Sequence, residues 1–376
     1  MFFVNHIACI MKPKLIIVIC ILFSHFVFSQ NVKEYKYWNP AVDDSFVLEG
    51  QAWPKEVKDY YDRLPAMAEN TVRKPVWELS KNSAGLKVRF RTNSTEIIVR
   101  YSVTGGLQMP HMPATGVSGV DLYARDADGN WLWAAGKYSF GDTIVYRFTN
   151  LIPSGEQGRE YHLYLPLYNS VKWMEIGVLK DNLFNPLSAG KDKPILVYGT
   201  SIAQGGCASR PGLAWTSILN RKLNIPVINL AFSGNGRLET EVIDFITQID
   251  VRLYVLDCLP NLTGTPTNAL KKRIVEAIMQ IQLKRPNTPI LLAEHDGYTD
   301  EKMNLVSRKS YQDANSALKN VFDSLTAKGM KNIFLLTKNE IDQDIESTVD
   351  GTHPNDIGMM HYADAYAKKI KDILMK

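Results

Sequence analysis

Alternation of apolar and polar residues gives the first half of the chain a β-type pattern. Residues 86–90 alternate in the way that a half-buried strand does, and Asp128-Gly129 is a strong hairpin turn signal between two apolar segments. Many short strands with frequent turns predict an antiparallel β-sandwich. The predicted strands cover 86–92, 96–103, 120–124, 131–135, 143–148, 161–165 and 171–178.

The pattern changes near residues 185–193. Beyond this point, short apolar segments alternate with stretches whose apolar residues recur at helical spacing. This order predicts a parallel sheet of five strands with helices on both faces, and such sheets hold ligands beyond the carboxyl ends of their strands. The predicted strands cover 195–198, 227–231, 253–256, 289–293 and 332–336, and a last helix runs from about 356 to 373.

Composition fits a folded protein of about two domains. The 376 residues are 45% hydrophobic and 22% charged, which allows a sizeable core. The formal net charge of +4 is small for this length, and no basic run stands out. Charge therefore gives no reason to expect a nucleic-acid partner.

The N-terminus resembles an export signal. Lys12 and Lys14 precede an apolar run at 15–28, and Ser29 offers a small residue for cleavage. The run is too short to span a bilayer comfortably, although an uncleaved anchor is the alternative. We expect a signal peptide at 1–29, a β-sandwich domain at 30–188 and a second domain at 189–376. The mature protein would then be exported from a bacterial cell and would not insert stably into a membrane.

Two cysteines, Cys207 and Cys258, remain after signal removal. An exported protein can join such a pair in a disulfide, which here would brace two loops at the end of the sheet. Two buried free thiols are the alternative. Neither cysteine has the spacing of a metal site.

Candidate catalytic residues follow the predicted parallel strands. Ser201 comes after the first strand, where Gly199 lets the backbone bend and a helix N-terminus adds free N–H groups. Gly234 and Asn261 follow the second and third strands and are suitable oxyanion donors. Each has an ordinary explanation when taken alone, such as a helix cap or a turn.

The fifth strand is followed by Asp350 and His353. A carboxylate three residues before a histidine can orient the imidazole and offset its developing charge. An Asx-turn beside an incidental histidine is the alternative. Serine, glycine, asparagine and the Asp/His pair nevertheless occur in succession at one predicted edge.

The second half of the chain, about 193–376, resembles the SGNH/GDSL hydrolase superfamily. Residues 199–202 match its first block, Gly234 its glycine block, Asn261 its asparagine block, and Asp350 with His353 its final block. Residues 119–123 (Gly-Val-Asp-Leu-Tyr) resemble the "GxDLY" β-domain of a bacterial subgroup. The chain departs from the broad family at Thr200, which usually is Asp, and before Asn261, where Leu-Pro replaces Gly-x.

This resemblance implies a flavodoxin-like three-layer sandwich behind a jelly-roll-like β-sandwich, and an acyl-enzyme mechanism that needs no metal and no organic cofactor. Ser201 would be the nucleophile, His353 its base and Asp350 the group that holds His353. The oxyanion would be bound by the N–H groups of Ser201 and Gly234 and by the Asn261 amide.

Three more residues are tentative substrate contacts. His111 lies in a β-domain loop that can reach over the esterase site. Arg210 follows the nucleophile by nine residues, and His295 follows the fourth strand. Ordinary surface positions are the alternative for His111 and Arg210, and His295 is also a rival base to His353.

The predicted activity is hydrolysis of short acyl esters, most often acetyl, on carbohydrate. Export, the small β-domain and the lack of a long apolar lid-like segment favour a small-molecule or polysaccharide ester as substrate. The alternatives are a lipase- or thioesterase-type acylhydrolase and a carbohydrate-binding protein with a decayed site. The oligomeric state stays open.

Overall fold

The computed structural model of the protein describes residues 33–42 and 46–375. The predicted signal peptide at 1–29 lies outside these residues. By backbone contacts, residues 35–376 form one compact unit. The predicted division after residue 188 falls in the connection between the last antiparallel strand and the first parallel one.

The second half builds a parallel sheet of five strands. Their spatial order, β13-β12-β14-β15-β16, places the first strand in the chain between the second and the third. Nearly every strand residue is buried, because helices cover both faces. The strands are β12 (Ile195–Gly199), β13 (Val227–Ala231), β14 (Leu253–Asp257), β15 (Ile290–Ala293) and β16 (Ile333–Leu336).

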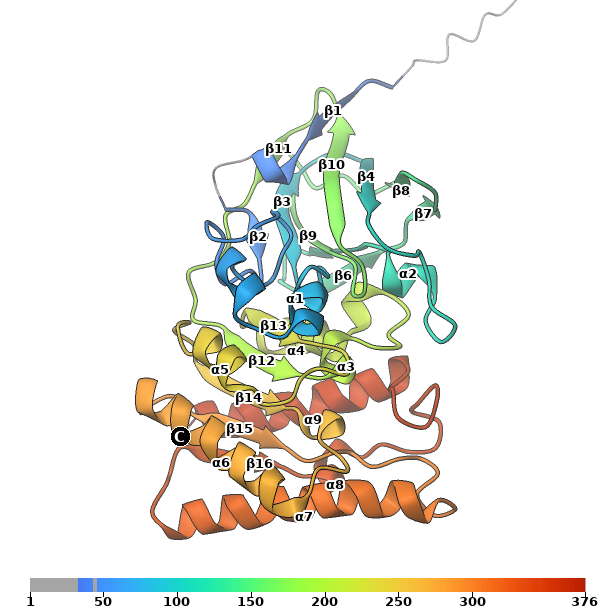
Figure 1. Ribbon diagram of the computed structural model, residues 1–376. Helices are drawn as coiled ribbons and strands as arrows, with labels where there is room; N and C mark the ends of the chain where they lie inside the picture. The colour runs from blue at the N-terminus through green and yellow to red at the C-terminus, as the bar shows by residue number, and fades with distance from the viewer. Residues whose placement is uncertain (1–32, 43–45, 376) are drawn as a thin grey trace, which may run out of the picture. The chain divides into compact units, whose positions relative to one another are not determined.

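Alternate side chains of each strand enter two different hydrophobic clusters. In β12, Leu196 and Tyr198 pack on one face, whereas Ile195 and Val197 pack on the other. One face is covered by α5 (Thr240–Ile246), α6 (Thr267–Lys284) and α7 (Leu305–Ala327), and the other by α4 (Trp215–Leu223) and α9 (Asp356–Leu374) (Figure 1).

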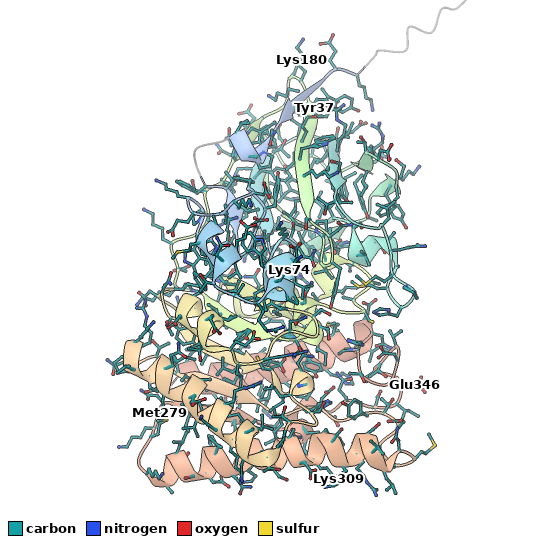
Figure 2. The ribbon with its side chains drawn as sticks, viewed as in Figure 1. Tyr37, Lys74, Lys180, Met279, Lys309 and Glu346 are labelled. Atoms are coloured by element: carbon teal, nitrogen blue, oxygen red, sulfur yellow. The ribbon has the colours of Figure 1, made fainter. Side chains whose placement is uncertain are left out.

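On helices α6 and α7, the side chains that face away from the sheet are exposed. Met279 on α6 and Lys309 on α7 project outward in Figure 2, and both side chains are exposed. The predicted three-layer arrangement is thus confirmed. Two short helices, α3 (Ser201–Gln204) and α8 (Lys338–Ile341), and the 3₁₀ turns η3 (Pro211–Leu213) and η4 (Leu259–Asn261) complete this half.

The first half forms two antiparallel sheets around a shared core, as the strand pattern predicts. One sheet has the order β1-β10-β4-β8-β7 and the other β11-β3-β9-β5-β6, with β2 beside β3. The strands are β1 (Tyr35–Trp38), β2 (Leu48–Glu49), β3 (Lys87–Thr92), β4 (Ile97–Val103), β5 (Asp121–Arg125), β6 (Trp131–Ala134), β7 (Lys137–Ser139), β8 (Ile144–Phe148), β9 (Arg159–Tyr164), β10 (Val171–Leu179) and β11 (Phe184–Pro186).

Most buried side chains of the segment between β2 and β3 pack against the parallel sheet, although Tyr61 joins the sandwich core. The segment contains η2 (Ala66–Asn70) and α1 (Lys74–Ser80), while η1 (Pro40–Val42) and α2 (Ala114–Val117) lie elsewhere in the first half. Trp53 and Trp77 join the hydrophobic cluster of α5, α6 and α7, and the Trp53 ring meets Phe245 edge-on with 6.1 Å between centroids. This part of the first half therefore completes the core of the second.

Arg63 of the same segment covers the free edge of the parallel sheet. Its Nη1 donates to the backbone oxygens of Asn229 and Ala231 on β13, at 2.9 Å each. Its other nitrogens donate to the carbonyls of Leu79 and Asn82. The side chain is buried, and burial lowers the pKa of Arg63 to about 9. One guanidinium thus pairs an edge that is otherwise open to another strand.

Both remaining cysteines are buried free thiols, so the bracing disulfide is absent. The Cys258 thiol lies 3.5 Å from the Tyr198 carbonyl oxygen, while burial, with the nearby Asp350 charge, raises the pKa of Cys207 to about 12. Within the described residues, no group of three or more acidic, histidine or cysteine side chains is placed to hold a metal. No helix in the same residues has the length and apolar character needed to cross a bilayer.

Candidate active site

The turn from β12 into α3 carries Ser201. Thr200 precedes the four-residue helix in an extended conformation, and Gly205 ends it at a φ of 108°. A Cβ on Gly199 would lie 2.6 Å from the Cβ of Ala203, so only glycine allows this tight reversal. Ser201 is the first helical residue, and its backbone N–H is one of those left without a partner inside a helix.

Two loops flank this turn because β13 and β14 are the neighbours of β12. In the register of the sheet, Gly199 pairs with Ala231 on one side and with Asp257 on the other. Gly234 follows the first of these strands in an exposed turn, and Asn261 ends η4 after the second. The structure therefore brings both predicted oxyanion residues to the edge that carries Ser201.

The Asn261 amide has a fixed orientation. Its Oδ1 accepts a hydrogen bond from the Gly236 N–H at 3.1 Å. The amide NH₂ group must then point the other way, and among the described residues it has no protein partner. An amide held by its oxygen presents its donor face without reorganisation, which is what an oxyanion donor requires.

Asp350 and His353 lie in the loop between α8 and α9. Asp350 Oδ1 accepts from the backbone N–H groups of Thr352 and His353, and Oδ2 lies 2.7 Å from the His353 Nδ1. The other ring nitrogen, Nε2, lies 2.9 Å from the Ser201 Oγ. An unbroken hydrogen-bond chain therefore joins a carboxylate, an imidazole and a hydroxyl.

The electrostatics of this chain favour an ionised Asp350. Partial burial disfavours its charge, but hydrogen bonds from the backbone N–H and ring of His353 outweigh burial and lower the pKa of Asp350. A carboxylate beside Nδ1 fixes the tautomer that leaves Nε2 free to accept a proton. The arrangement can deprotonate Ser201 and stabilise the imidazolium that results.

His111 is the tentative contact that the fold places beside this chain. Its exposed ring lies 6.0 Å from the His353 ring, measured between centroids. The β-sandwich thus contributes a residue to the rim of the site.

Arg210 and His295 have other partners within the protein. Arg210 pairs with the buried Asp121 of the GxDLY segment, donates to the Tyr123 hydroxyl and stacks over Trp133. The arginine therefore joins the two halves of the chain. His295 has no exposed surface, and its Nδ1 accepts a hydrogen bond from the Gly297 N–H.

Two supporting residues were not anticipated from sequence. The Gln204 Oε1 accepts from the Ser233 N–H at 2.9 Å, so α3 holds the loop of Gly234, and the Gln204 Nε2 donates to the Leu167 carbonyl of the first half. Tyr168 donates its hydroxyl to the Ser201 carbonyl oxygen at 3.1 Å. No local motif marks either residue, because both act across long sequence separations.

Two family models match the chain. Residues 192–371 match the GDSL-like lipase/acylhydrolase family, and residues 35–184 match the N-terminal region of SGNH-hydrolase-type esterases. No curated protein sequence matches the chain.

Solved structures extend the likeness over the whole described fold. A protein described as a GDSL-like lipase from Bacteroides ovatus is 32% identical, with a TM-score of 0.83 over 91% of this chain and 98% of that one. A salicylyl-acyltransferase from a tetracycline biosynthetic pathway is 18% identical, with a TM-score of 0.72 over 90% and 97%. An acetyl xylan esterase from the rumen bacterium Butyrivibrio proteoclasticus is 10% identical, with a TM-score of 0.53 over 91% and 99%. The last two proteins share the fold of this chain. The first protein, together with the two family models, shows that the chain belongs to the GDSL-like lipase/acylhydrolase family, in the group with a GxDLY N-terminal region.

Proposed function

We propose that the protein is an exported serine esterase that removes short acyl groups, acetyl above all, from carbohydrate. The observation that carries the proposal is the hydrogen-bond chain from Asp350 through His353 to the Ser201 hydroxyl. Such a chain is the arrangement that activates a serine for acyl transfer.

In the proposed mechanism, His353 Nε2 takes the Ser201 proton as Oγ attacks the ester carbonyl. The carbonyl oxygen becomes an oxyanion, which the N–H groups of Ser201 and Gly234 and the Asn261 amide would bind. The imidazolium then donates its proton to the leaving alcohol oxygen as the C–O bond breaks. Water, deprotonated by the same nitrogen, cleaves the acyl-enzyme and regenerates Ser201.

A cavity at the junction of the two halves is part of the proposal, as a carbohydrate subsite outside the reaction centre, because none of Ser201, Asp350 and His353 lines it. It has a volume of about 250 Å³ and is lined by Trp133, Tyr138, Thr115, Ser209 and Arg210 among others. Both aromatic rings are about half exposed. Exposed aromatic faces beside polar groups suit a pyranose ring, whose C–H face packs on them. The acetyl xylan esterase with the same fold agrees with this class.

The test compares ester hydrolysis by the mature protein with that of Ser201→Ala. We expect p-nitrophenyl acetate and acetylated xylan to be hydrolysed by the first protein, and a rate loss of about 10⁶-fold in the second. Ser310→Ala, on α7 and outside the predicted catalytic and oxyanion residues, is a matched serine-to-alanine control and should retain full activity. Equal turnover by Ser201→Ala and the parent protein would refute the proposed nucleophile.

A series of p-nitrophenyl esters of increasing chain length separates the alternatives. Preference for acetate over octanoate supports the proposed substrate, whereas preference for long chains would support a lipase-type acylhydrolase. Binding of xylan without turnover by a folded protein would support the carbohydrate-binding alternative.

A further inference from the structure

The tip of the loop before α2 carries His111 in a tight turn. Met109 and Met112 exchange backbone hydrogen bonds in both directions, at 3.0 and 3.1 Å. Pro110 and His111 are the two residues enclosed by this pair. The turn therefore fixes the backbone that carries the imidazole.

The same loop is anchored on the segment that follows the nucleophile. The Met112 side chain is buried in the hydrophobic cluster that includes Ile202 and Trp215. Thr115 donates its hydroxyl to the Ser209 carbonyl at 2.7 Å. A Cβ on Gly116 would lie 2.3 Å from the Ala208 carbonyl oxygen, so the two backbones are in close contact. His111 is thus held at its place by the hydrolase half.

The His111 ring is available to a ligand. It is exposed, and within the described residues neither ring nitrogen has a hydrogen-bond partner. Its distance of 6.0 Å from the His353 ring leaves the two imidazoles side by side at an interplanar angle of 35°.

The chemistry of acyl transfer decides which half of the ester borders His111. His353 Nε2 must give its proton to the leaving oxygen, so the alcohol half of the substrate has to lie against the His353 ring. The oxyanion donors instead surround the carbonyl oxygen. A ring adjacent to His353 and outside the donor loops therefore faces the alcohol.

We propose that His111 binds the alcohol half of the ester by hydrogen-bonding a sugar hydroxyl next to the acylated oxygen. The inference rests on the proposed esterase function and deepens it. The β-sandwich would then help to select the substrate, rather than only supporting the hydrolase half.

The experiment compares kcat/KM for a monoacetylated methyl xyloside with that for p-nitrophenyl acetate, whose leaving group carries no hydroxyl. In His111→Ala, we expect the ratio of the two values to fall about ten- to a hundred-fold, largely through KM for the xyloside. His111→Gln, which keeps a donor, should recover part of the ratio. Gln108→Ala, an exposed position in the same loop, should leave the ratio unchanged.

Each other outcome overturns the inference. An equal loss of kcat/KM for both substrates in His111→Ala, with slower deacylation in a burst assay, would mean that His111 acts through His353. An unchanged ratio in His111→Ala would mean that the ring does not contact the alcohol. A parent protein that cleaves p-nitrophenyl acetate but no acetylated xyloside would refute the sugar alcohol, while leaving the Ser201 esterase intact.

Discussion

Asp350 uses its two carboxylate oxygens for different partners. One oxygen accepts two backbone N–H groups within its own loop, and the other faces the His353 ring. Loop shape and imidazole orientation therefore depend on the same side chain. A substitution that separates these two roles tests the proposed triad.

Asp350→Asn is expected to keep the loop but to misorient the imidazole. The amide oxygen can still accept from the backbone, which turns its NH₂ group toward Nδ1 and favours the wrong tautomer. We expect kcat for p-nitrophenyl acetate to fall about 10³- to 10⁴-fold, with little change in melting temperature. Parent-like activity in Asp350→Asn would remove Asp350 from the mechanism.

Asp257, at the end of β14, is a buried carboxyl that the proposed mechanism does not use. Burial, with the nearby Asp296, raises the pKa of Asp257 to about 7. The unfolded chain loses this proton near pH 4, so between about pH 4 and 7 the folded state holds the extra proton. The free energy of unfolding must then fall as the pH rises through this interval, and stay level above it.

We therefore expect Asp257→Asn to remove this pH-dependent loss. The stability of the variant relative to the parent protein should rise between pH 4 and 7, by on the order of a few kcal/mol. Urea unfolding of both proteins at pH 5 and pH 8 measures the difference. Parallel stability profiles would show that Asp257 ionises normally in the folded protein.

At the scale of elements, the five predicted parallel strands agree with the structure to within one residue at every end. A strand buried on both faces needs a continuous apolar run, and such runs are visible in a sequence. Strands β1, β2, β7 and β11 were not predicted. Strands β2, β7 and β11 have only two or three residues, and the side chains of β1 are half-buried or exposed and follow no clear alternation. The fold class is confirmed, whereas the roles of the site residues remain predictions.

The contacts between elements could not be predicted in the same way. Gln204 and Tyr168 act through single hydrogen bonds to residues far along the chain. His295 follows a strand at the active edge, and only packing against Tyr298 and Tyr311 decides that it is buried. Such outcomes depend on tertiary neighbours rather than on local pattern.

Arg63 gives an element-scale prediction. Arg63→Met keeps most of the side-chain volume but leaves the carbonyls of Asn229 and Ala231 buried without a donor. We expect a loss of about 2–5 kcal/mol in the free energy of unfolding, measured in guanidinium chloride. Arg63→Lys keeps the charge but not the planar arrangement of donors, so its free energy of unfolding should lie between those of the parent protein and Arg63→Met. A loss below about 0.5 kcal/mol in Arg63→Met would contradict the edge-covering role.

For the whole molecule, the boundary between the hydrophobic cores does not coincide with the boundary between the two halves of the chain. The cluster under α5, α6 and α7 includes six buried residues of the first half: Trp53, Leu64, Ala68, Val72, Val76 and Trp77. A fragment that starts at residue 189 would lack all of them and would expose the apolar surface that they cover. The proposed domain division therefore does not mark two independent folding units.

A fragment of residues 189–376 is accordingly expected to be aggregated or poorly folded. The expected signs are a broad thermal transition and strong binding of a hydrophobic dye, with no esterase activity. As a control, the first half is added as a separate chain, and recovery of a cooperative thermal transition would show that the fragment lacked only the packing of that half. A soluble fragment with a cooperative transition like that of the full chain would contradict this prediction.

Trp53 and Trp77 also imply an order of events during folding. The sandwich core takes its residues from Val47 to Val178, so it can close before the second half has been synthesised. The two tryptophans and Arg63 must wait for β13 and the helices after it, which begin at least 150 residues later in the chain. Tryptophan fluorescence should therefore change in two stages during refolding. The second stage would follow the burial of Trp53 and Trp77, and it would mark the time at which the turn that carries Ser201 meets its neighbouring loops.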